Sequence, residues 1–319
     1  MLIYLPIADV AVNVWAILFL GGAVGLISGL FGVGGGFLLT PLLIMSGIPP
    51  AVAVATQAPQ VVAAAVSGAL AYGARSLIDF RMGLVLLLSG LLGSRVGVEI
   101  FGELQRIGQV EFTVTALYVV LLTSIGGLMA WESYAALRSP RPAGGEIRRA
   151  PPKLFRRLPF QMTFRAAGQT YSVIPPICIG FSVGALGAIM GVGGGFIMVP
   201  AMIYLLGMTT SMSIGTSLFQ IMIVMAGTTL FHATETGSVD AVLAVTLLLG
   251  SVVGAQIGAL LAHVLRAASL RFLLALLVLG VAVALALNLF LKPSSVFSLS
   301  AATSALGGAS GAGPWGLIA

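Results

Sequence analysis

Long apolar stretches, separated by short polar ones, follow one another from about residue 12 to about residue 291. Most are long enough for a helix that crosses a bilayer, which needs about 20 apolar residues. The second stretch of each half is shorter and, at 1.5 Å per residue, spans about half of a hydrocarbon core about 30 Å thick. The pattern predicts helices at about 12–32, 37–47, 51–73, 83–101 and 110–131, and again at about 174–190, 196–206, 211–232, 240–262 and 270–291.

The two halves of the chain repeat one another. When Gly25 is placed on Gly184, "GVGGGFLLTP" aligns with "GVGGGFIMVP", and after a shift of one residue "ATQAPQ" aligns with "GTSLFQ". Internal repeats of this kind are typical of secondary transporters. We therefore expect an all-α polytopic membrane protein with two repeats of about five helical segments each, in which the second helix is short or broken.

Basic residues indicate how the repeats are oriented. The stretch between them holds eight: Arg138, Arg141, Arg148, Arg149, Lys153, Arg156, Arg157 and Arg165. The positive-inside rule places this linker in the cytoplasm. The loop near residue 75 has Arg75 and Arg81, whereas its counterpart has Glu235, Asp240 and no basic residue. An inverted second repeat, with both termini outside, explains the difference; a parallel arrangement of four plus four helices is the alternative.

These boundaries divide the chain into a first membrane repeat at 1–131, a basic cytoplasmic linker at 132–173, a second membrane repeat at 174–292 and a flexible tail at 293–319. In the linker, apolar and polar residues alternate around Met162 and Phe164, which predicts a small β-hairpin against the membrane. An unstructured basic linker is the alternative.

Composition agrees with a membrane protein. Hydrophobic residues make up 59% of the 319 residues and charged residues 8%, whereas a soluble domain has about a quarter charged residues. The net charge of +6 comes mainly from the linker, where anionic lipids attract basic residues, so we expect no nucleic-acid partner. The single Cys178 is expected to be a buried structural thiol. His232 and His263 are expected to be solvated at helix ends, so the sequence predicts no catalytic residue, metal site or cofactor, and no enzyme.

Three consecutive glycines are the most unusual feature of each repeat. No GK[ST] follows them and no glycine stands at position 37, so neither of the two nucleotide-binding motifs fits. Consecutive glycines break a helix and leave backbone amides that lipid cannot satisfy. A short helix follows, and the start of a helix attracts anions. We expect an anion site at the two breaks, near the midplane: Gly34, Gly35, Gly36, Gly193, Gly194 and Gly195.

Polar side chains on the next helix of each repeat are expected to complete this site: Thr56, Gln57, Gln60, Thr216, Ser217 and Gln220. Hydrogen bonds between helices are the alternative use of such residues, and for the two threonines both interpretations stay open. Arg95 is a charge within a membrane helix, which favours a position facing a cavity, where it would guide anions. Pairing with Glu99, one turn away, is the alternative.

The doubled GxGGGxxxxP motif, "GTSLFQ" and the linker "LPFQMTFRAAG" resemble the sulfite exporter TauE/SafE family of membrane permeases over about residues 15–290. The resemblance implies export of sulfite, an organosulfonate or a related sulfur-containing anion across a bacterial inner membrane. Export down an inside-negative potential needs no ATP-hydrolysing motif, and the sequence has none. We favour uniport over proton coupling, and a non-transporting assembly or scaffold subunit is the competing function. A homodimer is left open.

Overall fold

The computed structural model describes residues 2–31, 36–138, 161–164, 169–262 and 267–291. Gly34, Gly35, His263, most of the linker and the tail therefore lie outside the described residues. The helices are α1 (Val14–Phe31), α2 (Gly36–Met45), α3 (Pro50–Gly73), α4 (Phe80–Arg106), α5 (Val110–Arg138), α6 (Ile174–Met190), α7 (Gly195–Tyr204), α8 (Thr210–Phe231), α9 (Ala241–Ala262) and α10 (Ala267–Leu291), and a π-helical turn, η2 (His232–Thr236), continues α8. The prediction of an all-α membrane protein is confirmed.

Helices α4 and α5 are longer than the sequence predicted, and α10 begins three residues earlier, at Ala267. Helix α4 begins at Phe80 because the carboxylate of Asp79 accepts hydrogen bonds from the backbone N–H groups of Arg81 and Met82, at 3.0 and 3.2 Å. Helix α5 continues to Arg138, beyond the expected end of the first repeat at residue 131. No glycine or proline stands between residue 131 and Pro140, so the chain has no local reason to end the helix at residue 131.

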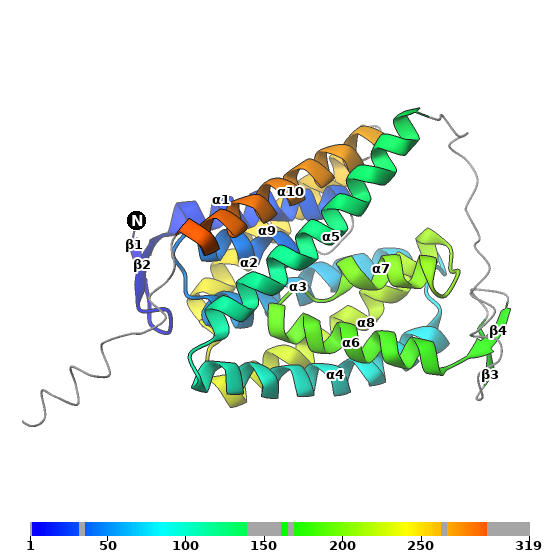
Figure 1. The fold of residues 1–319 in the computed structure, drawn as a ribbon, viewed down its shortest axis with the longest axis horizontal. Coiled ribbons are helices and arrows are strands. Elements are labelled where there is room, and N and C mark those ends of the chain that lie inside the picture. Colours follow the sequence, from blue (N-terminus) through cyan, green and yellow to red (C-terminus); the bar gives the residue numbers. More distant parts are fainter. Residues whose placement is uncertain (1, 32–35, 139–160, 165–168, 263–266, 292–319) are drawn as a thin grey trace, which may run out of the picture.

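Each half begins with an antiparallel β-hairpin that leads into its first helix. Strands β1 (Leu2–Leu5) and β2 (Val10–Asn13) form the first, and β3 (Gln161–Phe164) and β4 (Gln169–Ser172) form the second. Leu2 and Gln161 begin equivalent strands 159 positions apart, the same separation that relates Gly25 to Gly184. Figure 1 shows the two hairpins at opposite ends of the helical bundle. The duplication therefore includes the hairpins as well as the helices.

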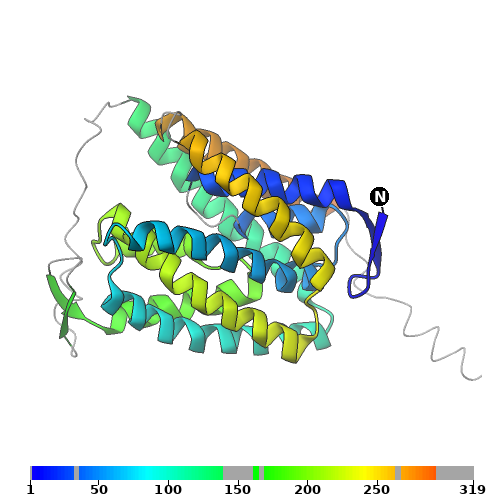
Figure 2. The same cartoon turned by 180° about the vertical axis from the view of Figure 1, so that it is seen from behind.

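Helices of one half pack against helices of the other half. Helix α1 packs along α9, and its equivalent α6 packs along α4; α3 packs against its own equivalent α8, and α5 against α10. Figure 2 shows the α1–α9 pair on one side of the bundle and the α4–α6 pair on the other. The main helix pairs between the two halves thus occupy equivalent positions in the repeats.

Glycines allow these pairs to approach closely. A Cβ atom added to Gly97 of α4 would lie 2.5 Å from the carbonyl oxygen of Ala185, and one added to Gly254 of α9 would overlap the backbone of Gly22. Small residues at such crossings are the usual means of bringing membrane helices together.

Large apolar side chains cover the outside of the bundle. Trp15, Phe19 and Leu128 are 66–79% exposed, which suits lipid and would be unfavourable in water. Five described helices are long and apolar enough to cross a membrane: Pro50–Leu70, Phe80–Arg106, Val110–Leu128, Thr210–Thr236 and Ala241–Gly258. Cys178 is exposed on α6, so the prediction of a buried thiol was wrong. A helix surrounded by lipid can carry an apolar thiol on its outer face.

Candidate anion site between the two repeats

The short helices α2 and α7 begin next to one another in the centre of the bundle. Phe37 and Phe196, which follow the glycines in the two repeats, stack in parallel with ring centroids 4.3 Å apart and an interplanar angle of 3°. Both rings are buried, at 1% and 4% exposure. The stacked aromatic rings bring the two helix starts together in this structure, and the positive ends of two helix dipoles therefore meet here.

The glycines before α7 adopt a backbone that other residues avoid. Gly191, Gly193 and Gly194 have φ values of +72°, +71° and +72°, in the left-handed region that favours glycine. A Cβ atom on Gly191 would lie 2.7 Å from the carbonyl oxygen of Val54, and one on Gly193 would lie 2.6 Å from Val61 Cγ1. The carbonyl of Gly194 accepts the N–H groups of Ile197 and Met198. The N–H groups of Gly195 and Phe196, which come before these two at the start of α7, are therefore available to another partner.

Gln57 joins the two repeats. Its amide nitrogen donates to the backbone carbonyl of Gly36, at the start of α2, and to that of Gly191, at 2.7 Å. Its amide oxygen accepts the hydroxyl of Thr40. Gln57 is fully buried, and three hydrogen bonds occupy most of its capacity. The structure therefore gives Gln57 a bridging position, although the sequence favoured it as a ligand of the anion.

Gln60 and Gln220 have a different environment. Both are 1% exposed. Among the described residues, the two amide atoms of Gln60 have no hydrogen-bond partner, and the amide oxygen of Gln220 has none either. The same is true of the hydroxyl of Ser213, two turns before Gln220 on α8. A buried polar group without a partner destabilises a protein by about 1–3 kcal/mol. Unpartnered groups at equivalent positions of both repeats make this region the candidate site for a ligand.

The two threonines hold helices of different halves together. The hydroxyl oxygen of Thr56 accepts the N–H of Asp240 at 2.9 Å, and that of Thr216 accepts the N–H of Asp79 at 3.0 Å. Both aspartates cap the following helix with their carboxylates. Ser217, the counterpart of Gln57, donates to the carbonyl of Ile214 in its own helix at 2.9 Å. Of the two interpretations left open for the threonines, the observed contacts are hydrogen bonds between helices.

Comparison with known proteins places the chain in a family. The family model described as "Sulfite exporter TauE/SafE" matches residues 17–285, which is most of the chain and includes both breaks. The chain belongs to the TauE/SafE family. It is therefore a multi-pass membrane protein of a transporter family.

Curated relatives of this TauE/SafE protein are bacterial and plant proteins. "Probable membrane transporter protein YjnA" of Bacillus subtilis is 28% identical over 83% of this chain and 96% of its own length. A "Probable membrane transporter protein" of Xylella fastidiosa is 30% identical over 82% of this chain and 91% of its own. "Sulfite exporter TauE/SafE family protein 5" of Arabidopsis thaliana is 34% identical over 35% of this chain and 26% of its own. No solved structure shows significant similarity.

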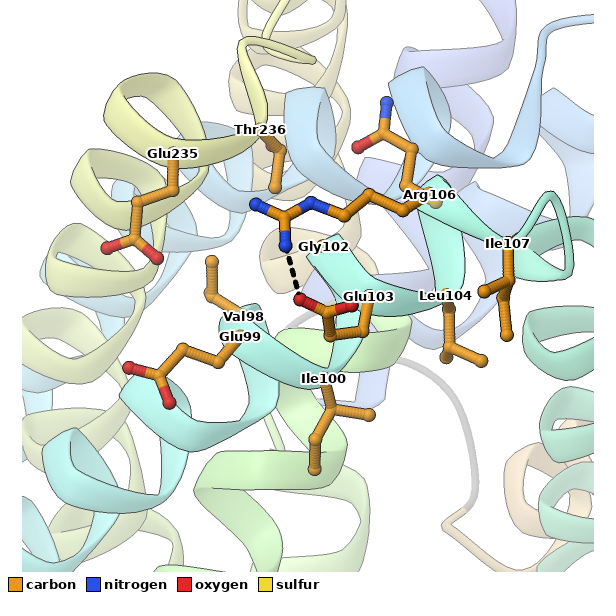
Figure 3. Close-up of a pocket in the computed structure, with 11 residues that line it drawn as sticks. Val98, Glu99, Ile100, Gly102, Glu103, Leu104, Arg106, Ile107, Glu235 and Thr236 are labelled. Atoms are coloured by element: carbon orange, nitrogen blue, oxygen red, sulfur yellow. Dashed lines mark hydrogen bonds and ion pairs between the residues drawn. The ribbon is translucent and has the colours of Figure 1, made fainter.

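Arg95 has partners other than the glycines of the two breaks and the buried glutamines. Its guanidinium pairs with Glu99, at 3.4 Å, and with Glu235 on η2, and it lies over the ring of Phe231. The side chain is 44% exposed. These contacts agree with the structural ion pair that the sequence left open. Nearby, an open cleft of about 710 Å³ is lined by residues near the end of α4, by Ile107 directly after it, and by Glu235 and Thr236 of η2 (Figure 3). Its three carboxylates, Glu99, Glu103 and Glu235, outnumber the two arginines that pair with them, Arg95 and Arg106, so the net negative charge would repel an anion.

Two side chains that the sequence did not suggest hold the end of α6, directly before the second break. The Nε2 atom of His232 lies 3.0 Å from the carbonyl oxygen of Ala188, and the hydroxyl of Tyr118 donates to the carbonyl of Met190. Both side chains are fully buried. The prediction of a solvated His232 was wrong, because η2 turns the ring inward against Phe101. Periodicity alone does not reveal such a turn.

Proposed function

We propose that the chain exports sulfite or a related sulfur-containing anion, such as an organosulfonate, across a bacterial inner membrane. Its membership of a sulfite exporter family supports the substrate class. The observation that carries the proposal is a group of buried polar atoms without a partner among the described residues, namely both amide atoms of Gln60, the amide oxygen of Gln220 and the hydroxyl of Ser213, in a protein with two helix starts at its centre. The amide nitrogen of Gln60 and the hydroxyl of Ser213 are donors, and an oxyanion accepts hydrogen bonds of this kind.

The proposed site binds the anion without a charged side chain. Backbone N–H groups at the start of α7, near Gly194 and Gly195, are donors whose helix dipole favours negative charge. The amides of Gln60 and Gln220 and the hydroxyl of Ser213 can donate further hydrogen bonds to oxygen atoms. A site built from neutral donors binds an anion less tightly than an arginine would, and weak binding suits a site from which the anion has to leave.

The membrane potential suffices as the driving force. An inside-negative potential favours the exit of each negative charge by about 2.3 kcal/mol per 100 mV, and of a dianion by about twice that. The buried carboxylates of Asp79 and Asp240 cap helices, a role that supports uniport over proton coupling. Proton coupling would require an acidic group that changes its protonation during transport.

The proposal includes an inverted second repeat, with the linker in the cytoplasm and both termini outside. Two observations support it. The hairpins that begin the two halves lie at opposite ends of the bundle (Figure 1). The loop after α3 and the first turn of α4 carry Arg75 and Arg81, whereas the equivalent turn after α8 carries Glu235 and no basic residue. Inversion would bring the starts of α2 and α7 together from opposite sides of the membrane, as in transporters with broken helices.

Flux measurements on the purified chain test the proposal. Proteoliposomes that contain only this protein should move labelled sulfite at a rate that rises with a potassium-diffusion potential and does not depend on a pH gradient. Gln60→Ala and Gln220→Ala should each raise KM, whereas Arg95→Gln, which copies Gln256 of the other repeat, should leave KM unchanged.

Three outcomes would count against parts of the proposal. Absence of flux for sulfite and for organosulfonates, in protein that is folded, would favour the scaffold function. Flux that follows the pH gradient would overturn uniport. A raised KM for Arg95→Gln together with normal values for both glutamine variants would place the anion elsewhere.

A further inference from the structure

The two short helices are equivalent in sequence but are held very differently. Seven of the ten residues of α2 are buried, compared with four of the ten residues of α7. Because the two helices are copies of one another, a difference in how they are packed does not follow from the repeat itself. It points to different tasks for the two copies.

Hydrogen bonds from side chains fix the start of α2. The amide of Gln57 binds the carbonyl of Gly36, and the hydroxyl of Thr40 binds Gln57 in turn. In the second repeat, Val199 stands in place of Thr40 and Ser217 in place of Gln57. Neither can form the bridge, since Val199 has no polar atom and Ser217 donates within its own helix. Among the described residues, no side chain donates a hydrogen bond to a carbonyl of Gly195–Met198.

The end of α6 is fixed as firmly as α2. Three of the four carbonyls from Ala188 to Gly191 are bound by buried side chains: that of Ala188 by His232, that of Met190 by Tyr118 and that of Gly191 by Gln57. The fixed part of the chain therefore ends at Gly191. After one further residue, Val192, come Gly193 and Gly194, whose left-handed backbone only glycine adopts readily. A rigid element followed by glycines is a typical arrangement for a hinge.

Packing around α7 also differs from packing around α2. Leu39, Leu43 and Ile48 of the first repeat correspond to Met198, Met202 and Met208 of the second. These three methionines are buried, and they form one cluster with Met82 and Leu86 of α4. Methionine is unbranched and can repack around a displaced neighbour, whereas branched side chains fit one arrangement. The cluster suits a helix that takes more than one position.

We infer that α7 is the moving half-helix, turning about Gly193 and Gly194, while α2 and the end of α6 form a fixed frame that Gln57 holds together. Gln57 is then a positioning residue. The purpose of this movement rests on the proposed function. If an anion binds between α2 and α7, its site opens when one of the two helices withdraws from the other. The asymmetry itself does not depend on the identity of the anion.

Hydrogen exchange of the full-length chain in lipid nanodiscs, followed by mass spectrometry without any substrate, tests this inference. Amides of residues 196–204 should exchange about tenfold faster than amides of residues 37–45, since local opening limits exchange in helices. Gln57→Ser, which copies Ser217, should accelerate exchange in residues 37–45. The double variant Met198→Leu with Met202→Leu, which copies Leu39 and Leu43, should slow exchange in residues 196–204.

The same leucine variant should lower the maximal rate of sulfite transport and leave KM unchanged, because it restricts movement without altering the site. Met45→Leu, the same substitution at an exposed position of α2, is the matched control and should change neither measurement. Equal exchange in the two helices, or leucine variants with unchanged exchange and turnover, would overturn the inference. A chain that fails to transport sulfite yet exchanges faster in α7 would instead overturn only the proposed function.

Discussion

Gln57 and Gln60 lie three residues apart on α3 and have opposite hydrogen-bonding environments. Gln57 makes three hydrogen bonds, to Thr40, Gly36 and Gly191, whereas neither amide atom of Gln60 has a partner among the described residues. A polar side chain that is kept buried and unpaired weakens the empty protein. Such a side chain is typical of a site whose partner arrives from solution.

Leucine substitutions should separate these two roles. Gln60→Leu and Gln220→Leu should raise the free energy of unfolding, by about 1–3 kcal/mol, because each removes an unpaired buried group, and both should weaken sulfite binding. Gln57→Leu should lower it by a similar amount, because it leaves two carbonyls and the Thr40 hydroxyl without a partner. Thermal unfolding in detergent and KM from flux measure the two effects. If Gln60→Leu destabilises the protein as much as Gln57→Leu does, Gln60 has a partner within the protein.

The sequence was sufficient to select the glutamines of the centre but not to tell them apart, and it did not select Ser213 or Thr40. Periodicity and the repeat indicated Gln57, Gln60 and Gln220, all of which are buried. Which amide has a partner depends on carbonyls contributed by the other half, such as that of Gly191, and no local pattern contains that information. Asp79 and Asp240 could have been found, because each stands at the N-cap position of a long apolar helix.

Whole helices were easier to predict than their ends. The ten predicted apolar stretches match the helices, since length and apolarity alone determine what can cross a bilayer. The first hairpin was missed, because its strands are only four residues long and lie within a sequence that is apolar on both faces. The first hairpin is equivalent to the segment around Met162, and this equivalence was the signal that could have revealed it. The equivalence appears only when the alignment of the two repeats is continued to residues before the first helix.

Glycines at helix crossings allow a test of packing between whole helices. Gly254→Ala should destabilise the protein by about 1–3 kcal/mol, because its Cβ atom would overlap the backbone of Gly22 and the helix α1 would have to move away. Gly280→Ala on α10 is the control, since its Cβ atom would have nothing within 4 Å. Thermal midpoints of the two variants measure the difference. A similar loss for both would mean that glycine matters through backbone flexibility and not through the contact between α1 and α9.

At the scale of the whole molecule, the proposed inversion predicts that equivalent loops face opposite sides of the membrane. Ala74 and Thr234 are equivalent and both are exposed. In a Cys178→Ala background, an impermeant thiol reagent applied to intact cells should label Thr234→Cys and not Ala74→Cys. Both should be labelled after the cells are permeabilised, which is the control for reactivity. Labelling of both in intact cells would favour the parallel arrangement.

The packing of α1 on α9 and of α4 on α6 has a consequence for how the chain acquires its fold. Neither half buries its own first helix, because the partner of that helix belongs to the other half. The hydrogen bonds from Asp240 to Thr56 and from Asp79 to Thr216 cross the same boundary. The two repeats are thus a single cooperative unit and not two modules on a tether. A fragment containing one repeat would expose the surfaces that pack against the other repeat, and it would have to associate with a second fragment before it could fold.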